Sequence, residues 1–289
     1  FTVKATDGTG FSGSAVPVSI VVASTGLPFA EDFSDTTVAG LTDWAISSTG
    51  SSVDTGSRLR IGASSTIGSA IYKTPFNSSR GLALQFDFDY VISGTVQGLS
   101  FFLLDGSVTS PVAGSTGPGL GYAYSQTGAG APRGYLGVGF DIGGNFATKN
   151  TTSSFHDGVD ASAHANSIAL RGPSTNASSL KAAAEYDYVT GSWTNLSPAG
   201  SKAVRLTLKP DGTLTMLLAA TNRVTWQTVY QNLGYAGTAA YTGIPAPNSL
   251  LLGFATAITT TNANNFVSLD NVSVTVPTDL GVAFASAPS

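Results

Sequence analysis

The chain has 289 residues, of which only 10% are charged, and its formal net charge is −4. It carries no cluster of basic residues, so it lacks the electrostatic footprint of a nucleic-acid-binding protein. The absence of cysteine excludes disulfides, thiolate metal sites and a cysteine nucleophile. The sequence contains no run of about twenty apolar residues, so it predicts no membrane-spanning helix. The length suits one large all-β domain, alone or with a fragment of another domain.

Residues 1–24 are predicted to form a β-hairpin. Apolar and polar residues alternate over 1–5 and over 16–22, and Asp7 and Gly8 signal a turn between the two runs. This pattern resembles the closing strands of cadherin-like and immunoglobulin-like repeats in large bacterial adhesins. Because an isolated hairpin is marginal in water, we expect it to pack on the following domain, to complete a repeat outside this sequence, or to extend a neighbouring chain's sheet. The chain begins with Phe inside this strand-like pattern, so we expect it to be part of a longer polypeptide.

Residues 25–276 are predicted to form one β-sandwich or barrel, because short strands alternate with Gly, Ser, Asn and Pro. The clearest strand is 82–91, with Leu and aromatic residues on one face and polar residues on the other. Strand 204–209 is expected to turn at Pro210-Asp211-Gly212 into a second strand. We expect almost no helix, and the best helical candidate, 178–186, is short. Residues 277–289 read as a linker or tail.

The most informative stretch is 134–145, GYLGVGFDIGGN. Apolar residues alternate with glycines up to Phe140, which predicts a buried strand packed closely against another backbone. Asp141 and Asn145 then fall on a Gly-rich turn, where a carboxylate and an amide oxygen can share a calcium ion. The Asn amide can also bond a pair of sugar hydroxyls. The alternative is that both side chains only make turn hydrogen bonds.

Four segments together resemble the L-type (legume-lectin-like) lectins, especially their bacterial relatives. They follow the family's order along the chain: QGLSFFL at 97–103, the stretch 134–145, NSI at 166–168 and GFAT at 253–256. The resemblance spans roughly residues 28 to 276. It implies an all-β, concanavalin A-like jelly-roll sandwich, to which the N-terminal hairpin is an addition.

The resemblance also implies a sugar site built from loops at one end of the sandwich. Gln97 takes the place of the usual Asp, so it keeps hydrogen-bonding capacity but lacks the charge that strengthens such contacts. Gly117 or Gly119 matches the glycine that offers a backbone N–H. Asn145 matches the sugar-binding amide, and Phe146 is the nearest aromatic residue for stacking. The fourth loop corresponds to 259–265.

The implied metal site is calcium alone. Asp141 and Asn145 match two calcium ligands, and Asp157 or Asp160 is a candidate for a third. The legume-type transition-metal site is not expected, because position 139 is Gly where the family has Glu. His156 and His164 also lack the spacing that the family's metal-binding His has before Asn166. His156-Asp157 remains a weak alternative metal site.

Enzyme activity is not expected. Glycosidases of the usual kind need two flanking carboxylates, and the two glutamates, Glu31 and Glu185, are far apart in sequence. Asp87 and Asp89 fall on the polar face of strand 82–91 and are interpreted as solvated surface. Neither histidine follows a Gly-x-Ser-x-Gly motif, and the Gly-rich runs lack the Lys-Ser/Thr of a phosphate-binding loop.

These observations predict an exported, extracellular, non-catalytic carbohydrate-binding domain of a bacterial surface adhesin. The scarcity of charge and the abundance of Ser, Thr, Gly, Ala and Asn are typical of such proteins. Its partners would be glycans and, through residues 1–24, neighbouring copies or domains. The alternative is a structural subunit or spacer that uses the lectin fold for protein contacts, which the replacement of Asp by Gln97 favours.

Overall fold

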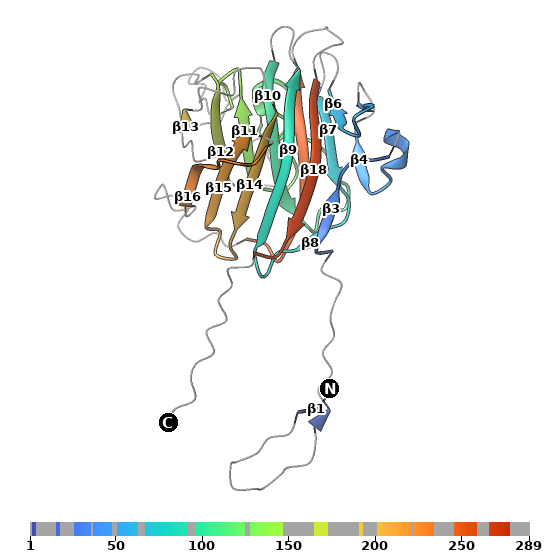
Figure 1. Ribbon diagram of the computed structural model, residues 1–289, viewed down its shortest axis with the longest axis vertical. Coiled ribbons are helices and arrows are strands. Elements are labelled where there is room, and N and C mark those ends of the chain that lie inside the picture. The colour runs from blue at the N-terminus through green and yellow to red at the C-terminus, as the bar shows by residue number, and fades with distance from the viewer. Residues whose placement is uncertain are drawn as a thin grey trace.

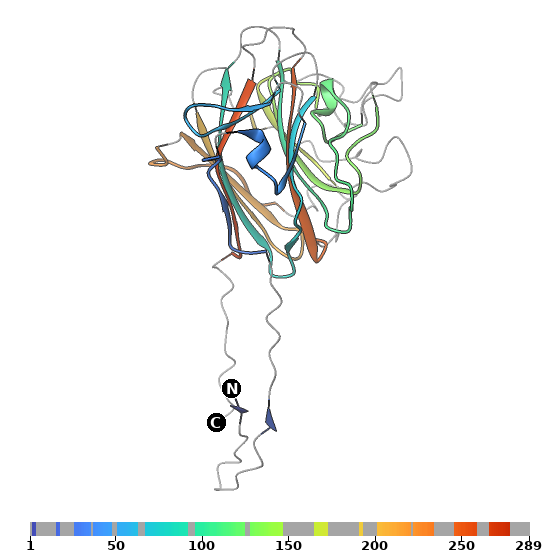
Figure 2. The same cartoon turned by 90° about the vertical axis from the view of Figure 1, so that its right-hand side faces the viewer.

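The computed structural model describes residues 2–3, 16–17, 26–35, 37–47, 51–62, 67–91, 96–124, 128–146, 165–172, 191–192, 201–220, 222–233, 246–258 and 266–277. Two antiparallel sheets pack face to face, as Figures 1 and 2 show. The predicted all-β sandwich is therefore confirmed. No helix in the described part of the chain has the length and apolarity needed to cross a membrane.

The first sheet, named here the β10 sheet, has eight strands in the order β13-β12-β11-β10-β17-β7-β4, with β8 beside β17. Its strands are β4 (Trp44–Ile46), β7 (Ile67–Tyr72), β8 (Phe76–Asn77), β10 (Val96–Asp105), β11 (Gly134–Asp141), β12 (Ser167–Arg171), β13 (Gly191–Ser192) and β17 (Ser249–Ile258).

The second sheet, the β9 sheet, also has eight strands, in the order β16-β15-β14-β9-β18-β6-β5, with β3 beside β18. Its strands are β3 (Phe29–Glu31), β5 (Ser52–Val53), β6 (Leu59–Ile61), β9 (Leu82–Val91), β14 (Lys202–Leu208), β15 (Leu214–Ala220), β16 (Gln227–Leu233) and β18 (Phe266–Thr275). The predicted strand 82–91 and the predicted hairpin, now β14 and β15, are both confirmed.

Among the described residues, only short elements lie outside the two sheets. They are β1 (Thr2–Val3), β2 (Val16–Pro17) and the 3₁₀ turns η1 (Val38–Gly40) and η2 (Gly117–Gly119). β1 pairs antiparallel with β2, and the rest of the predicted N-terminal hairpin lies outside the described residues. The helical candidate 178–186 and the tail after residue 277 lie outside them as well.

The main core fills the space between the sheets with aromatic rings. Leu82, Leu84, Phe86 and Phe88 of β9 are each at most 3% exposed, as their alternation with polar residues predicts. The Phe86 ring lies 5.0 Å from Phe254 of the facing sheet, in an edge-on arrangement that aromatic pairs favour. This packing holds the two sheets together without disulfides.

A second apolar layer covers the outer face of the β10 sheet. Residues between β10 and β11, including Leu120 and Tyr122, pack there with Phe102 of β10 and with Phe146. All eight residues of β11 are buried as a result. The β10 sheet is thus buried on both faces, which accounts for the nearly continuous apolar run in 99–104.

Strand pairing defines two ends of the sandwich. Gly98 pairs with Asp141 and with Ala257, and Asp141 pairs with Ser167, so these residues mark one end. β3 begins and β18 finishes at the other end, the lower one in Figure 1. The loop that follows Asp141 therefore lies at the end opposite to residues 28 and 276.

Candidate functional site

The turn after β11 is organised by the carboxylate of Asp141. Its Oδ1 accepts a hydrogen bond from the backbone N–H of Gly144 at 2.7 Å, and its Oδ2 accepts one from Phe146 at 2.5 Å. Asp141 is only 1% exposed. The side chain therefore acts inward on its own loop, as Asp does in many turns. We call residues 141–146 the Asp141 loop.

Burial raises the pKa of Asp141 to about 7, because the charged form loses its hydration inside the protein. The backbone N–H groups of Phe146, Gly144 and Gly143 and the positive charge of Arg171 act in the opposite direction. Burial and these contacts thus have opposite effects on the pKa of Asp141. The charge of the carboxyl group depends on how well the loop holds these donors.

Asn145 and Gln97 lie side by side, as the sequence predicted for a shared sugar site. The Asn145 Nδ2 group donates to Oε1 of Gln97 at 3.4 Å and to the carbonyl of Gly143 at 3.2 Å. The backbone carbonyl of Gln97 accepts hydrogen bonds from the backbone N–H groups of Ile142 and Gly143, both at 2.9 Å. Both side chains are half-buried. They form a small amide pair where the start of β10 meets the Asp141 loop.

Phe146 was predicted as an aromatic platform for a sugar, but its ring is 0% exposed. The ring packs over Gly139, where a Cβ would lie 2.8 Å from Cε1 of Phe146 and closer still to Cδ1. In this conformation the ring offers no face to a ligand. The same contact corrects the interpretation of the Gly-rich strand: aromatic rings, instead of another backbone, approach its glycines. Tyr122 covers Gly137 in the same way.

Arg171 is the residue of this region that sequence reasoning missed. It lies at the end of β12 and is 2% exposed. Its Nε donates to the carbonyl of Phe146 at 2.7 Å, and a terminal nitrogen donates to the same oxygen. Its guanidinium carbon lies 5.2 Å from the centre of the Phe146 ring, within cation–π range. An arginine closing the apolar run SIALR was the available signal.

Gly117 and Gly119 bound the turn η2, which is fixed against β10. The Ser100 hydroxyl donates to the carbonyl of Leu120 at 2.6 Å. Ser100 lies three positions after Gln97 in β10. Gly119 is buried, and its carbonyl accepts the N–H groups of Tyr122 and Ala123. Gly117 has a φ of +65°, and a Cβ at that position would meet no atom within 4 Å. Of the two glycines, Gly117 is the one with open space beside it.

The described residues show no calcium site at Asp141. Calcium binds oxygen lone pairs, and each carboxylate oxygen of Asp141 uses one of its two lone pairs to accept a backbone N–H. No group of three or more His, Cys, Asp or Glu side chains suited to a metal occurs within the described ranges. Asp157, Asp160, His156 and the loop 259–265 lie outside them. A side chain at position 139 would collide with the Phe146 ring.

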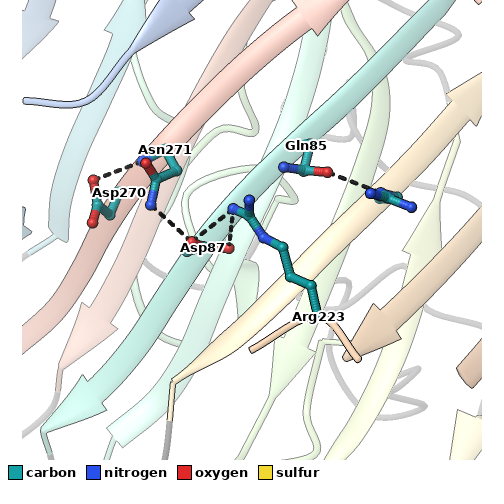
Figure 3. A network of polar contacts seen from close by, with 6 residues as sticks. Gln85, Asp87, Arg223, Asp270 and Asn271 are labelled. Atoms are coloured by element: carbon teal, nitrogen blue, oxygen red, sulfur yellow. Dashed lines mark hydrogen bonds and ion pairs between the residues drawn. The ribbon is translucent and has the colours of Figure 1, made fainter. Parts of the chain in front are cut away.

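Asp87, interpreted from the sequence as solvated surface, is instead covered on the outer face of the β9 sheet. Figure 3 shows Arg223 reaching the carboxylate, and one guanidinium nitrogen contacts both oxygens at 2.9 Å. The Asn271 amide donates to the same carboxylate at 2.9 Å, which leaves Asp87 8% exposed. A carboxylate tied in this way is a structural group. Asp89 is less constrained and lies 3.9 Å from Arg58.

Several solved lectin structures have a similar fold. The metal-free form of lectin I-B4 from Griffonia simplicifolia aligns with a TM-score of 0.55 at 15% identity, over 86% of this chain and 98% of that one. Lectin UEA-II complexed with galactose gives 0.55 at 18%, over 87% and 99%. The exoplasmic/lumenal domain of VIP36, in a Ca²⁺/Man2-bound form, gives 0.52 at 11%, over 89% and 88%.

No family model and no curated protein sequence matches the chain. At these identities the likeness establishes the fold alone. The chain is an all-β, two-sheet sandwich of the legume-lectin, concanavalin A-like type. The predicted fold class is therefore correct, and the fold by itself does not determine what the domain binds.

Proposed function

We propose that this chain is a non-catalytic carbohydrate-binding domain whose site lies at the end of the sandwich where Gln97 and Asn145 meet. The amide pair of Gln97 and Asn145 is the observation that carries the proposal. Two neighbouring amides offer donors and acceptors in the pattern that adjacent hydroxyls of a sugar can satisfy. Several proteins of the same fold are lectins, including one complexed with galactose.

The Asn145–Gln97 hydrogen bond is long, at 3.4 Å, so little is lost when a ligand replaces it. A sugar hydroxyl can accept from Asn145 and donate to Gln97 in place of this contact. Neither amide carries a charge, so each new hydrogen bond is of the weaker, neutral kind. We therefore expect weak binding by one domain and useful avidity only from several copies on a surface.

A glycan array probed with purified protein tests this proposal. The wild type is expected to bind one group of related glycans. Asn145→Ala should lose at least about tenfold in affinity, equivalent to roughly 1.4 kcal/mol. Asn248→Ala is the matched control, because Asn248 is exposed and precedes β17 at the opposite end. Equal loss in both variants, or none in Asn145→Ala, would show that the site lies elsewhere.

A structural role is the second candidate, and the inward-facing groups of the Asp141 loop favour it. Phe146 is buried, and Gln97 and Asn145 satisfy part of each other's hydrogen-bonding capacity without a ligand. In this version the domain is a spacer or subunit of a surface filament, and residues 1–24 join it to a neighbour. Sedimentation of the chain with and without residues 1–24 tests it: assembly that depends on the segment supports this role, and a monomer in both cases contradicts it.

We also propose an extracellular location on a bacterial surface adhesin. The low content of charged residues supports this, as does the suitability of weak sites for repeated display. Protease treatment of intact producing cells tests the location. Digestion of the domain on intact cells is expected, and protection until the cells are lysed would contradict it.

A further inference from the structure

We infer that Arg171 supplies the positive charge that organises the Asp141 loop, so that this loop takes its native form without calcium. The inference concerns the same loop as the proposed sugar site. It rests on that proposed function only for the claim that the loop binds a ligand. Arg171 is a positioning residue here, because it acts on the backbone that presents Asn145.

The contacts of Phe146 carry the inference. Its N–H donates to Asp141, and its carbonyl accepts from the guanidinium of Arg171. The backbone of one loop residue is therefore held between the buried carboxyl group of Asp141 and a buried cation. Hydrogen bonds to charged groups are stronger than neutral ones. Asn145 directly precedes this clamped residue, so its position follows from the clamp.

When Asp141 is ionised, the charges of the described loop residues balance. Asp141 carries the one ionisable acid of residues 141–146, and Gln97 and Asn145 are neutral. Arg171 is close enough for its charge to act on Asp141 and is itself 2% exposed. Buried charges are tolerated when they are paired and hydrogen-bonded. A divalent cation beside Asp141 would add unbalanced positive charge next to the guanidinium.

The surrounding packing fixes Arg171 in this position. Its guanidinium lies against the Phe146 ring, and the ring itself rests on Gly139 of β11. Arg171 pairs with Gly137 of β11, whose missing side chain leaves room for Tyr122. Gly139 thus leaves space for the ring of Phe146, and Gly137 leaves space for the ring of Tyr122. The two rings enclose the region in which Arg171 lies. A planar, rigid donor fork suits such a site better than an ammonium group on a flexible stem.

Thermal melting without any sugar tests the inference, so its result is independent of whether the domain binds glycans. The wild type is melted in millimolar calcium chloride and in excess chelator, and the two melting temperatures are expected to agree within about 1 °C. A melting temperature that chelator lowers by several degrees, and calcium restores, would overturn the inference.

Variants of Arg171 supply the second arm. Arg171→Met should lower the melting temperature by roughly 5 °C or more, because it leaves Asp141 buried without its cation. Arg171→Lys should recover part of this loss, since it keeps the charge but not the paired donors. The matched control is Arg80→Met in an exposed turn, which should change little. A loss no larger for Arg171→Met than for Arg80→Met would also overturn the inference.

A double variant separates the charge effect from simple packing. If Arg171 compensates Asp141, then Arg171→Met should cost clearly less when Asp141→Asn is already present. Equal losses in the two backgrounds would mean that the arginine only fills space, which would contradict the inference. If Arg171→Met fails to fold, the calcium and chelator comparison on the wild type still decides the matter.

Discussion

The ring of Phe146 fills the space that a side chain on Gly139 would need, so the strand and the loop after it fit only as a pair. A Cβ on Gly139 would lie 2.8 Å from Cε1 of Phe146. This contact places the Asp141 loop over β11 and sets the position from which Asn145 extends.

Gly139→Ala is therefore expected to destabilise the protein by about 1–3 kcal/mol, the usual range for overpacking a core. The matched control is Gly56→Ala in an exposed turn, where the new Cβ would meet only the side chain of Asp54 at 3.3 Å. Denaturant unfolding measures both variants. Similar small effects in the two would contradict the packing described here.

Asp141 predicts a pH dependence of stability with an unusual sign. Its pKa is raised from an ordinary 3.8 to about 7 in the folded protein. Between these values the folded state keeps a proton that the unfolded state has released, so stability falls as the pH rises, by up to about 1.4 kcal/mol per unit. This contribution is fully present below about pH 4 and is lost by about pH 7.

Comparing wild type with Asp141→Asn isolates this group from the other acids. The unfolding free energy of the wild type minus that of Asp141→Asn should fall from pH 4 to pH 7. It should stay constant above pH 7.5. A difference that grows in favour of the wild type over the same range would mean that the loop's N–H donors outweigh burial.

The contact between Asp87 and Arg223 predicts a larger stabilisation than an ordinary surface ion pair. The carboxylate is 8% exposed, and Arg223 contacts both of its oxygens. Asp87→Ala should cost about 2–3 kcal/mol, because Arg223 and Asn271 lose their acceptor. Arg133→Ala, which breaks the exposed pair with Asp105, should cost at most about 1 kcal/mol. Chemical unfolding of the two variants gives the comparison, and equal costs would contradict it.

Gln97→Asp distinguishes a binding site from a structural end of the sandwich. A carboxylate accepts stronger hydrogen bonds than an amide, so sugar affinity should rise by about tenfold, or 1.4 kcal/mol. The added negative charge near Asp141 should at the same time lower stability. Titration calorimetry with the best glycan from the array measures the affinity. A stable variant whose affinity is unchanged would remove Gln97 from the sugar site.

The sequence was a good guide to the strands, because their signal is local. Alternation in 82–91 predicted β9 residue for residue, and Pro210-Asp211-Gly212 marked the β14–β15 turn. The resemblance to L-type lectins implied that Gln97 and Asn145 share one end of the sandwich, and their side chains lie together. Contacts between distant segments were not predicted: nothing in the sequence places the Phe146 ring on Gly139, or brings Arg223 across to Asp87.

Function is the part that packing alone does not determine, and one measurement tests the central claim most directly. The purified chain is melted with a panel of simple sugars at about 50 mM, each with and without chelator. A sugar bound with a millimolar dissociation constant should stabilise the protein by about 2 kcal/mol, or roughly 5 °C, whether or not chelator is present. A chain whose melting temperature responds to no sugar would contradict the carbohydrate-binding account.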